Sequence, residues 1–158
     1  MFDSAQIRKE ISAALDPIRN TLAPGVLLRI HPNKVQDLVV DDLGGDILIL
    51  FPSERTIEND RTFAANHQTR VQKVSIVISL PEYYSATGAG KVAERVENAI
   101  EQFKVTGALF PLTFDSRREY FQGKRWVLDL TFDIMGRQRI DEITGTIPQI
   151  TSIGIDIL

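Results

Sequence analysis

The amino-acid sequence predicts an α+β fold, in which two helices pack on one face of a mainly antiparallel or mixed sheet and an Ile-rich C-terminal tail follows. Apolar residues recur at three- and four-residue steps in residues 5–22 and 92–103, which indicates two amphipathic helices. Apolar and polar side chains alternate over residues 124–135, which is typical of a strand with one buried and one wet face. The 158 residues suit one domain, to which we assign residues 1–139, with residues 140–158 as an apolar extension and interface segment.

The first helix is expected to begin at Asp3 or Ser4, since either side chain can cap it. Pro17 complicates this helix, because an interior proline removes a backbone donor. Two alternatives follow: one kinked helix that ends near residues 23–25, or a second short helix capped by Asp16. The continuing stripe favours the single kinked helix, whose apolar face consists of Ile7, Ile11, Ala14, Leu15, Ile18 and Leu22.

Strands are predicted between the two helices. Residues 26–30 and 46–51 fit short strands, and residues 69–80 fit a long one. Residues 34–45 are ambiguous, with helical spacing ahead of a Gly-Gly turn. Residues 53–68 are polar and carry mixed charge, so they predict a mobile loop.

After the second helix the pattern indicates a hairpin. Gly107 stands where a C-terminal cap belongs, and residues 109–115 and 124–135 read as antiparallel strands joined by a loop. The alternation puts Asp129 and Asp133 on the wet face, separated by about 13 Å at roughly 3.3 Å per residue, too far to share a proton or a metal ion. The opposite, core-facing side of the last strand carries Trp126, Leu128, Leu130, Phe132 and Ile134.

The amino-acid composition excludes several classes of protein. Apolar residues make up 43% of the chain and charged residues 25%, as in soluble globular proteins, and no apolar run is long enough to span a membrane. The net charge of −3 argues against a dedicated nucleic-acid binder. The chain has no cysteine, which excludes disulfides and thiolate sites and fits a protein made in the cytoplasm.

The motifs that suggest chemistry are incomplete. The sequence GAGK at residues 88–91 resembles a phosphate loop, but Ser85 replaces a required glycine and Val92 replaces the magnesium-binding Ser or Thr, so we read the start of a helix. Ser53, Asp60 and His67 could in principle form a hydrolase triad, but the sequence has no nucleophile elbow that would support one. The sequence therefore predicts no enzyme, no metal site and no cofactor.

A cluster of basic and aromatic residues lies around the predicted hairpin loop. Arg117, Arg118, Tyr120 and Arg125 are the residue types that both nucleic-acid sites and protein interfaces favour. Because the overall charge is negative, we interpret them as a candidate subunit or partner interface, with a solvated turn as the simpler alternative.

Two further regions are candidate contact surfaces. Ile153, Ile155 and Ile157 alternate as an added strand would, so we predict that residues 145–158 contact a neighbouring subunit; folding back on the same domain is the alternative. Asp129 and Asp133 form a second candidate contact surface, because their carboxylates could pair with arginines of a neighbouring copy.

The order of these segments resembles the Mu-like family of bacteriophage tail terminators. The resemblance covers residues 5–139 and is carried by IRKEISAALDPI, DILILF, QTRVQKVSIVISL, GKVAERVENAIEQF and RWVLDLTFDIMGRQ. It implies a virion structural protein that forms a ring, usually a hexamer, caps the tail tube and stops its polymerisation. In such a ring Asp129 and Asp133 are candidate channel-facing residues, and the loop of residues 53–68 would contact the tube or the head-side partner.

The same resemblance implies the partners. These are further copies of the chain, the tail tube protein, a head-completion or neck protein and a sheath protein, with DNA only as passing cargo and no membrane. The protein would be found in the tail or neck of the virion, after assembly in the host cytoplasm. The competing hypotheses are a small protein- or ligand-binding adaptor that acts as a monomer or dimer, and a hydrolase with a site around His67.

Overall fold

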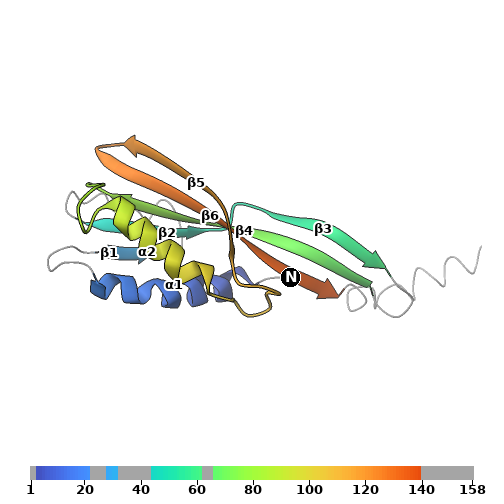
Figure 1. The fold of residues 1–158 in the computed structure, drawn as a ribbon. Coiled ribbons are helices and arrows are strands. Elements are labelled where there is room, and N and C mark those ends of the chain that lie inside the picture. Colours follow the sequence, from blue (N-terminus) through green and yellow to red (C-terminus); the bar gives the residue numbers. More distant parts are fainter. Residues whose placement is uncertain (1–2, 22–27, 32–43, 62–65, 140–158) are drawn as a thin grey trace, which may run out of the picture.

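Two helices cover one face of a six-stranded mixed sheet in the computed structural model, which describes residues 3–21, 28–31, 44–61 and 66–139 (Figure 1). The strand order is β1-β2-β4-β6-β5, and β3 also pairs with β4. Only β1 and β2 pair in parallel among these strands, so the predicted α+β class with a mainly antiparallel sheet is confirmed. In chain order the elements are α1 (Ser4–Thr21), β1 (Leu28–His31), β2 (Gly45–Leu50), β3 (Glu54–Arg61), β4 (Asn66–Leu80), α2 (Ala89–Glu101), β5 (Thr113–Gln122) and β6 (Arg125–Arg139).

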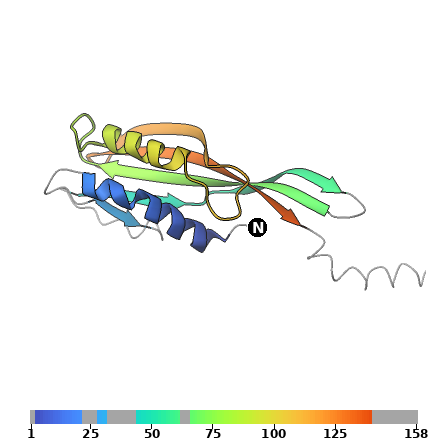
Figure 2. The ribbon, with the colours of Figure 1, turned by 60° about the horizontal axis from the view of Figure 1, so that its bottom comes forward.

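The sheet has two parts, which we call the body and the arm. Strands β4 and β6 are 15 residues long and run through both parts. In the body, β2 pairs with residues 75–79 of β4 under the helices. In the arm, β3 pairs with residues 66–72 of the same strand, beyond the reach of either helix (Figures 1 and 2).

Helix α1 is a single element that includes Pro17, as the continuing apolar stripe predicts. The Asp3 carboxylate accepts hydrogen bonds from the amides of Ala5 and Gln6 at 3.0 and 3.4 Å, so Asp3 caps the helix. Four residues of the predicted face are almost completely buried against the sheet and α2: Ile7, Ile11, Leu15 and Ile18.

Helix α2 packs beside α1 through Ala89, Val92, Ala93, Val96 and Ile100. The prediction that Gly107 caps it is wrong. The helix ends at Glu101, and Gly107 lies further on, at φ +87° in a turn closed by a 3.1 Å bond from the Ala108 amide to the Val105 carbonyl. The C-cap position is taken by Gln102 at φ −101°, so this helix end does not need the left-handed region, whereas the turn at Gly107 does.

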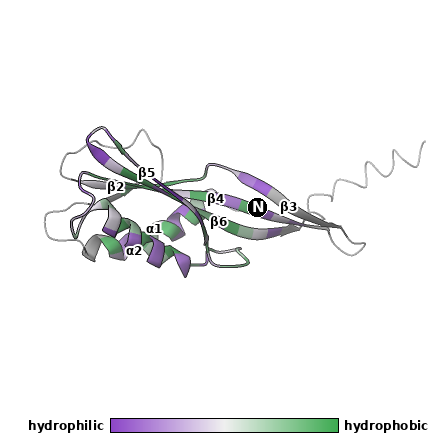
Figure 3. Ribbon diagram, turned by 45° about the horizontal axis from the view of Figure 1, so that its top comes forward, coloured by the Kyte–Doolittle hydropathy of each residue, from purple (hydrophilic) through white to green (hydrophobic). Residues whose placement is uncertain are grey.

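The prediction of a mobile loop over residues 53–68 is also wrong, because most of this segment forms a hairpin. Strand β3 pairs with β4 from Glu54 opposite Gln72 to Arg61 opposite Asn66, and residues 62–65 lie outside the described part. Strand β3 is mostly hydrophilic (Figure 3) because no helix covers the arm, so backbone pairing rather than an apolar stripe holds the strand there.

The second hairpin is longer than predicted. Strand β5 begins at Thr113 and continues to Gln122, so residues 109–112 precede it. Of the basic and aromatic cluster, Arg117, Arg118 and Tyr120 lie within β5, and Arg125 is the first residue of β6. Gly123 and Lys124 form a two-residue turn with φ of +60° and +62°, the signs that a type I′ hairpin turn requires. Residues 34–43 and the Ile-rich tail of residues 140–158 lie outside the described residues.

Candidate subunit interface along strand β5

Strand β5 forms one edge of the body. It pairs with β6 along one side, no described strand pairs with its other side, and all ten of its residues are exposed. The register shifts between Phe114 and Ser116, which indicates a bulge at Asp115. An edge strand of this length offers a row of backbone donors and acceptors to another chain.

The pairing with β6 decides which face each β5 side chain joins. Arg117, Glu119 and Phe121 lie opposite Leu130, Leu128 and Trp126, so they share the face that the helices cover. Arg118 and Tyr120 lie opposite Asp129 and Val127, on the helix-free face. The two neighbouring arginines of the predicted interface therefore point to opposite faces of the sheet.

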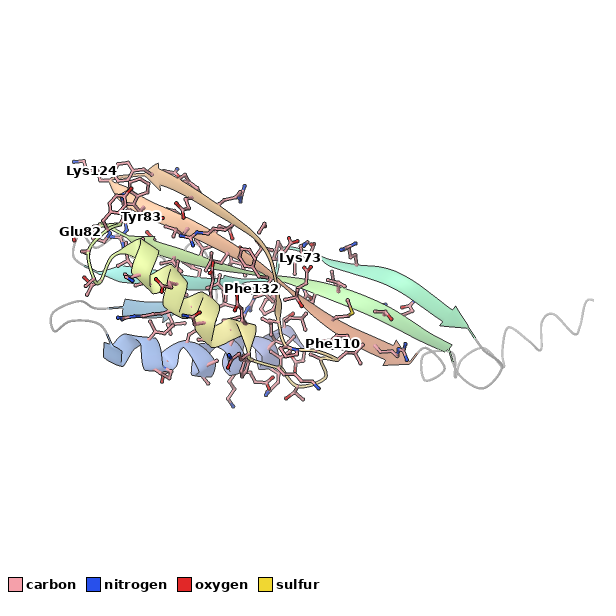
Figure 4. The ribbon with its side chains drawn as sticks, viewed as in Figure 1. Lys73, Glu82, Tyr83, Phe110, Lys124 and Phe132 are labelled. Carbon is pink, nitrogen blue, oxygen red and sulfur yellow. The ribbon has the colours of Figure 1, made fainter. Side chains whose placement is uncertain are left out.

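Exposed aromatic residues lie at both ends of the helix-side face. Near the start of β5, Phe110 and Phe114 are 57% and 41% exposed, and the Phe114 ring meets the buried Phe132 ring edge-on at 5.8 Å. Near its end, Phe121 is 57% exposed and Tyr84 is 90% exposed. Figure 4 shows Phe110 and Tyr83 beyond opposite ends of α2. Aromatic side chains at such exposure are typical of protein interfaces.

The aromatic group at the end of β5 is held in place by its own packing. The Trp126 ring lies between those of Tyr83 and Phe121, with centroids 5.0 and 5.2 Å away, and Tyr84 meets Tyr83 at 4.7 Å. Tyr84 is therefore an exposed side chain that rests on a supported aromatic platform. The sequence analysis missed it, although the Tyr-Tyr pair directly after a strand was a visible signal.

A polar network occupies the middle of the helix-side face. The Arg117 guanidinium donates to the Glu119 carboxylate at 2.7 and 2.5 Å and lies 3.5 Å from that of Glu97 on α2. The Tyr83 hydroxyl donates to the same Glu119 at 2.9 Å; burial and this bond raise the pKa of Tyr83. The network ties β5 to α2 and borders an open groove of about 380 Å³, which is lined by Tyr83, Tyr84, Gly90, Lys91, Glu94, Glu97 and Arg117.

On the helix-free face, Asp129 and Asp133 lie where the alternation predicts, since Leu128, Leu130 and Phe132 between and beside them are buried on the other face. Both carboxylates are paired within the chain. Asp129 accepts from Arg118 at 3.0 Å and from the Ser75 hydroxyl.

The second of these carboxylates belongs to a three-residue cluster. Lys73 binds Asp133 and Asp115, each at 2.9 Å. The hydrogen bonds to Asp115 and Asp133 raise the pKa of Lys73 above its ordinary value of about 10.5. Partners from the next copy are therefore not needed to balance the two aspartates, and a channel-facing role stays a prediction.

Arg125 has a different position from the one expected for an exposed interface cation. It is 8% exposed, and its guanidinium donates to the Ser79 hydroxyl at 2.8 Å and to the Gly44 carbonyl at 2.6 Å, with Asp46 at 3.5 Å. Burial of an arginine requires such partners, and here β2 and β4 provide them. Arg125 therefore holds the sheet together, and Ile153, Ile155 and Ile157 lie outside the described residues.

The GAGK sequence starts a helix, as interpreted. The amides of Ala89 and Gly90 donate to the carbonyls of Glu82 and Tyr83, at 2.8 and 3.2 Å, so these groups are already bound. A Cβ atom at Gly88 would lie 2.4 Å from the Tyr83 carbonyl oxygen, which explains the glycine by close backbone approach.

The proposed hydrolase residues do not assemble. Asp60 and His67 are register partners in the arm, whereas the Ser53 carbonyl binds the Lys73 amide at the base of the arm, roughly 20 Å along the strand from His67. Within the described residues, no group of three His, Asp or Glu side chains could hold a metal ion. Neither described helix has the length and apolarity needed to cross a membrane.

The comparisons with known proteins show a likeness to solved structures but not to curated sequences. Searches of family models and of curated proteins find no match. Among solved structures, a chain of the virion of a native gene transfer agent (GTA) particle has the same fold, with a TM-score of 0.51 and 14% sequence identity. The likeness covers 85% of this chain and 97% of that chain.

Proposed function

We propose that the protein is a structural component of a phage-like particle, and specifically a tail terminator. In this role it forms a ring, most simply a hexamer, that caps the tail tube, stops its polymerisation and offers a surface to a head-completion or neck protein. It acts without catalysis or a cofactor, in the tail or neck of a virion assembled in the host cytoplasm. A sheath protein is a further partner, and DNA passes through the ring as cargo.

The observation that carries this proposal is the fold shared with a GTA virion chain over 97% of that chain. The exposed edge of β5, with aromatic residues at both ends, supports it, because a ring subunit needs contact surfaces on its sides. The resemblance of residues 5–139 to Mu-like tail terminators supports the more specific role of terminator among virion proteins. Asp129 and Asp133 would face the channel in this arrangement.

Oligomeric state is the first test. Light scattering coupled to size exclusion should give a mass about six times that of the 17.7 kDa chain, and negative-stain images should show rings with a central hole. A mass of one or two chains at micromolar concentration would favour the adaptor, whose binding site would then be the groove beside Tyr83.

Position in the particle is the second test. Gold-labelled antibodies against the chain should mark one end of each tail, at the junction with the head, in particles from producing cells. Labelling along the whole tail would instead indicate a tube or sheath protein. Labelling of capsids alone would overturn a tail function.

A further inference from the structure

The hairpin geometry determines which β5 residues point their backbone N–H and C=O groups toward the outer edge of the strand. In a hairpin with a two-residue turn, the residues that flank the turn form a hydrogen-bonded pair, here Gln122 and Arg125. The backbone groups of Phe121, Glu119 and Arg117 therefore point away from β6, toward the free edge. A strand that added there would find a regular ladder of donors and acceptors.

The side chains along this edge prefer one kind of partner. On the helix-side face, the exposed rings of Phe114 and Phe121 would stay in water unless an apolar side chain covered them. On the helix-free face, the Arg118 side chain is 76% exposed, so it can meet an acidic residue in addition to Asp129. The matching strand has an apolar face and an acidic face.

Residues 152–158 of this same chain, SIGIDIL, have that pattern. Ile153, Ile155 and Ile157 would share one face of an extended strand, and Asp156 would lie on the other with Ser152 and Gly154. We propose that this segment adds as a strand to the outer edge of β5 in a neighbouring copy, with Asp156 beside Arg118 and the isoleucines on the helix-side face. In this register Ile153 covers Phe121 if the added strand is antiparallel, and lies next to Phe114 if it is parallel.

The path of β6 is why we assign the edge to a neighbouring copy. Strand β6 leaves the body along the arm and ends at Arg139, about 20 Å beyond Asp133, the last β6 residue that pairs with β5. To reach its own β5 the following chain would have to reverse, whereas residues 140–151, about 40 Å when extended, can continue to a second subunit. A tail that covers the next subunit's edge is a heterologous contact, the kind that closes rings. The inference thus rests on the proposed ring.

Disulfide trapping in the full chain tests the proposal. Because the sequence has no natural cysteine, only the introduced cysteines can react. If Asp156 lies opposite Arg118, Gly154 lies opposite Tyr120 in an antiparallel addition and opposite Ser116 in a parallel one. We would make Gly154→Cys with Tyr120→Cys, and Gly154→Cys with Ser116→Cys. The matched control combines Gly154→Cys with Asn98→Cys, an exposed position on α2.

One of the two edge variants should form a ladder of covalently linked chains within minutes of mild oxidation, and the control should not. Which variant reacts also gives the strand direction. A disulfide within single chains would overturn the proposal, because the tail would then cover its own subunit. Crosslinking no faster than in the control would overturn it as well.

Replacing Ile153, Ile155 and Ile157 by Lys separates this inference from the proposed function. The wild-type chain and a triple Ile→Val control should both give the ring mass, and the Lys variant should give single chains that still melt cooperatively. If the Lys variant keeps the ring mass, the tail contact is wrong although the ring stands. If the wild-type chain is itself monomeric, both the ring and the tail contact fail.

Discussion

In the body of the sheet, β4 and β6 bury one face under α1 and α2, whereas in the arm the same two strands continue with no helix above them (Figure 2). Body residues such as Ile76 and Leu130 are fully buried. Apart from the buried Val71, the arm is held by backbone pairing and polar contacts. These include a 2.9 Å ion pair between Arg70 and Glu54 and a 2.8 Å bond from the Gln72 side chain to the Ser53 carbonyl. One pair of strands thus serves a stable core at one end and an uncovered, projecting sheet at the other.

The largest effect is expected from the core of the body. Changing Phe132 to Ala removes a fully buried ring from beneath α2 and should lower the free energy of unfolding by about 4 kcal/mol. Urea denaturation would measure this, with Thr131→Ala on the helix-free face as control. Equal losses in both variants would mean that the helix-covered face of the body contributes no more to stability than its helix-free face.

Arg125 tests whether the helix-free face of the body is also a structural core. Arg125→Ala leaves Asp46, which is 1% exposed, without one of its cationic neighbours, and should cost about 3 kcal/mol. The control is Arg137→Ala, an exposed residue of the arm, with an expected cost within about 0.5 kcal/mol. A loss below about 1 kcal/mol for Arg125→Ala would return this residue to the candidate interface.

A smaller effect should come from Lys73, at the junction of body and arm. Its pKa is raised in the folded protein, so its contribution is fully present below pH about 10.5 and is lost as the pH rises through the folded value. Unfolding measured at pH 9 and pH 11 should show an alkaline loss that Lys73→Met reduces by about 0.5 kcal/mol. Part of the alkaline loss of stability should remain in the variant, because the pKa of Tyr83 is also raised in the folded protein. An unchanged loss would contradict the role of Lys73.

The smallest effect is expected in the arm. Arg70→Ala removes the ion pair with Glu54, in which both side chains are about a quarter exposed, and should cost about 0.5 kcal/mol or less. Amide exchange should show the same order, because β3 lacks the cover that β2 has, so its amides exchange faster than those of β2. Slower exchange in β3 than in β2 would show that the arm is the more stable part.

Much of the fold could be predicted because the relevant signals are local. The stripe from Ile7 to Ile18 and the alternation from Leu128 to Ile134 each report a buried face through spacing alone, and the structure confirms both. The same alternation placed Asp129 and Asp133 on the helix-free face. These predictions succeed because one face of each element packs on a single core.

Three features were decided only by tertiary structure. Strand β3 forms because β4 offers it a backbone partner, and its polar sequence carries no period that would reveal this. Arg125 is buried because Ser79, Gly44 and Asp46, distant in the sequence, converge on its guanidinium. The exposed edge of β5 follows from its place at the end of the strand order. Pairing and burial between distant segments depend on which surfaces meet, whereas periodicity reports only the element in which it occurs.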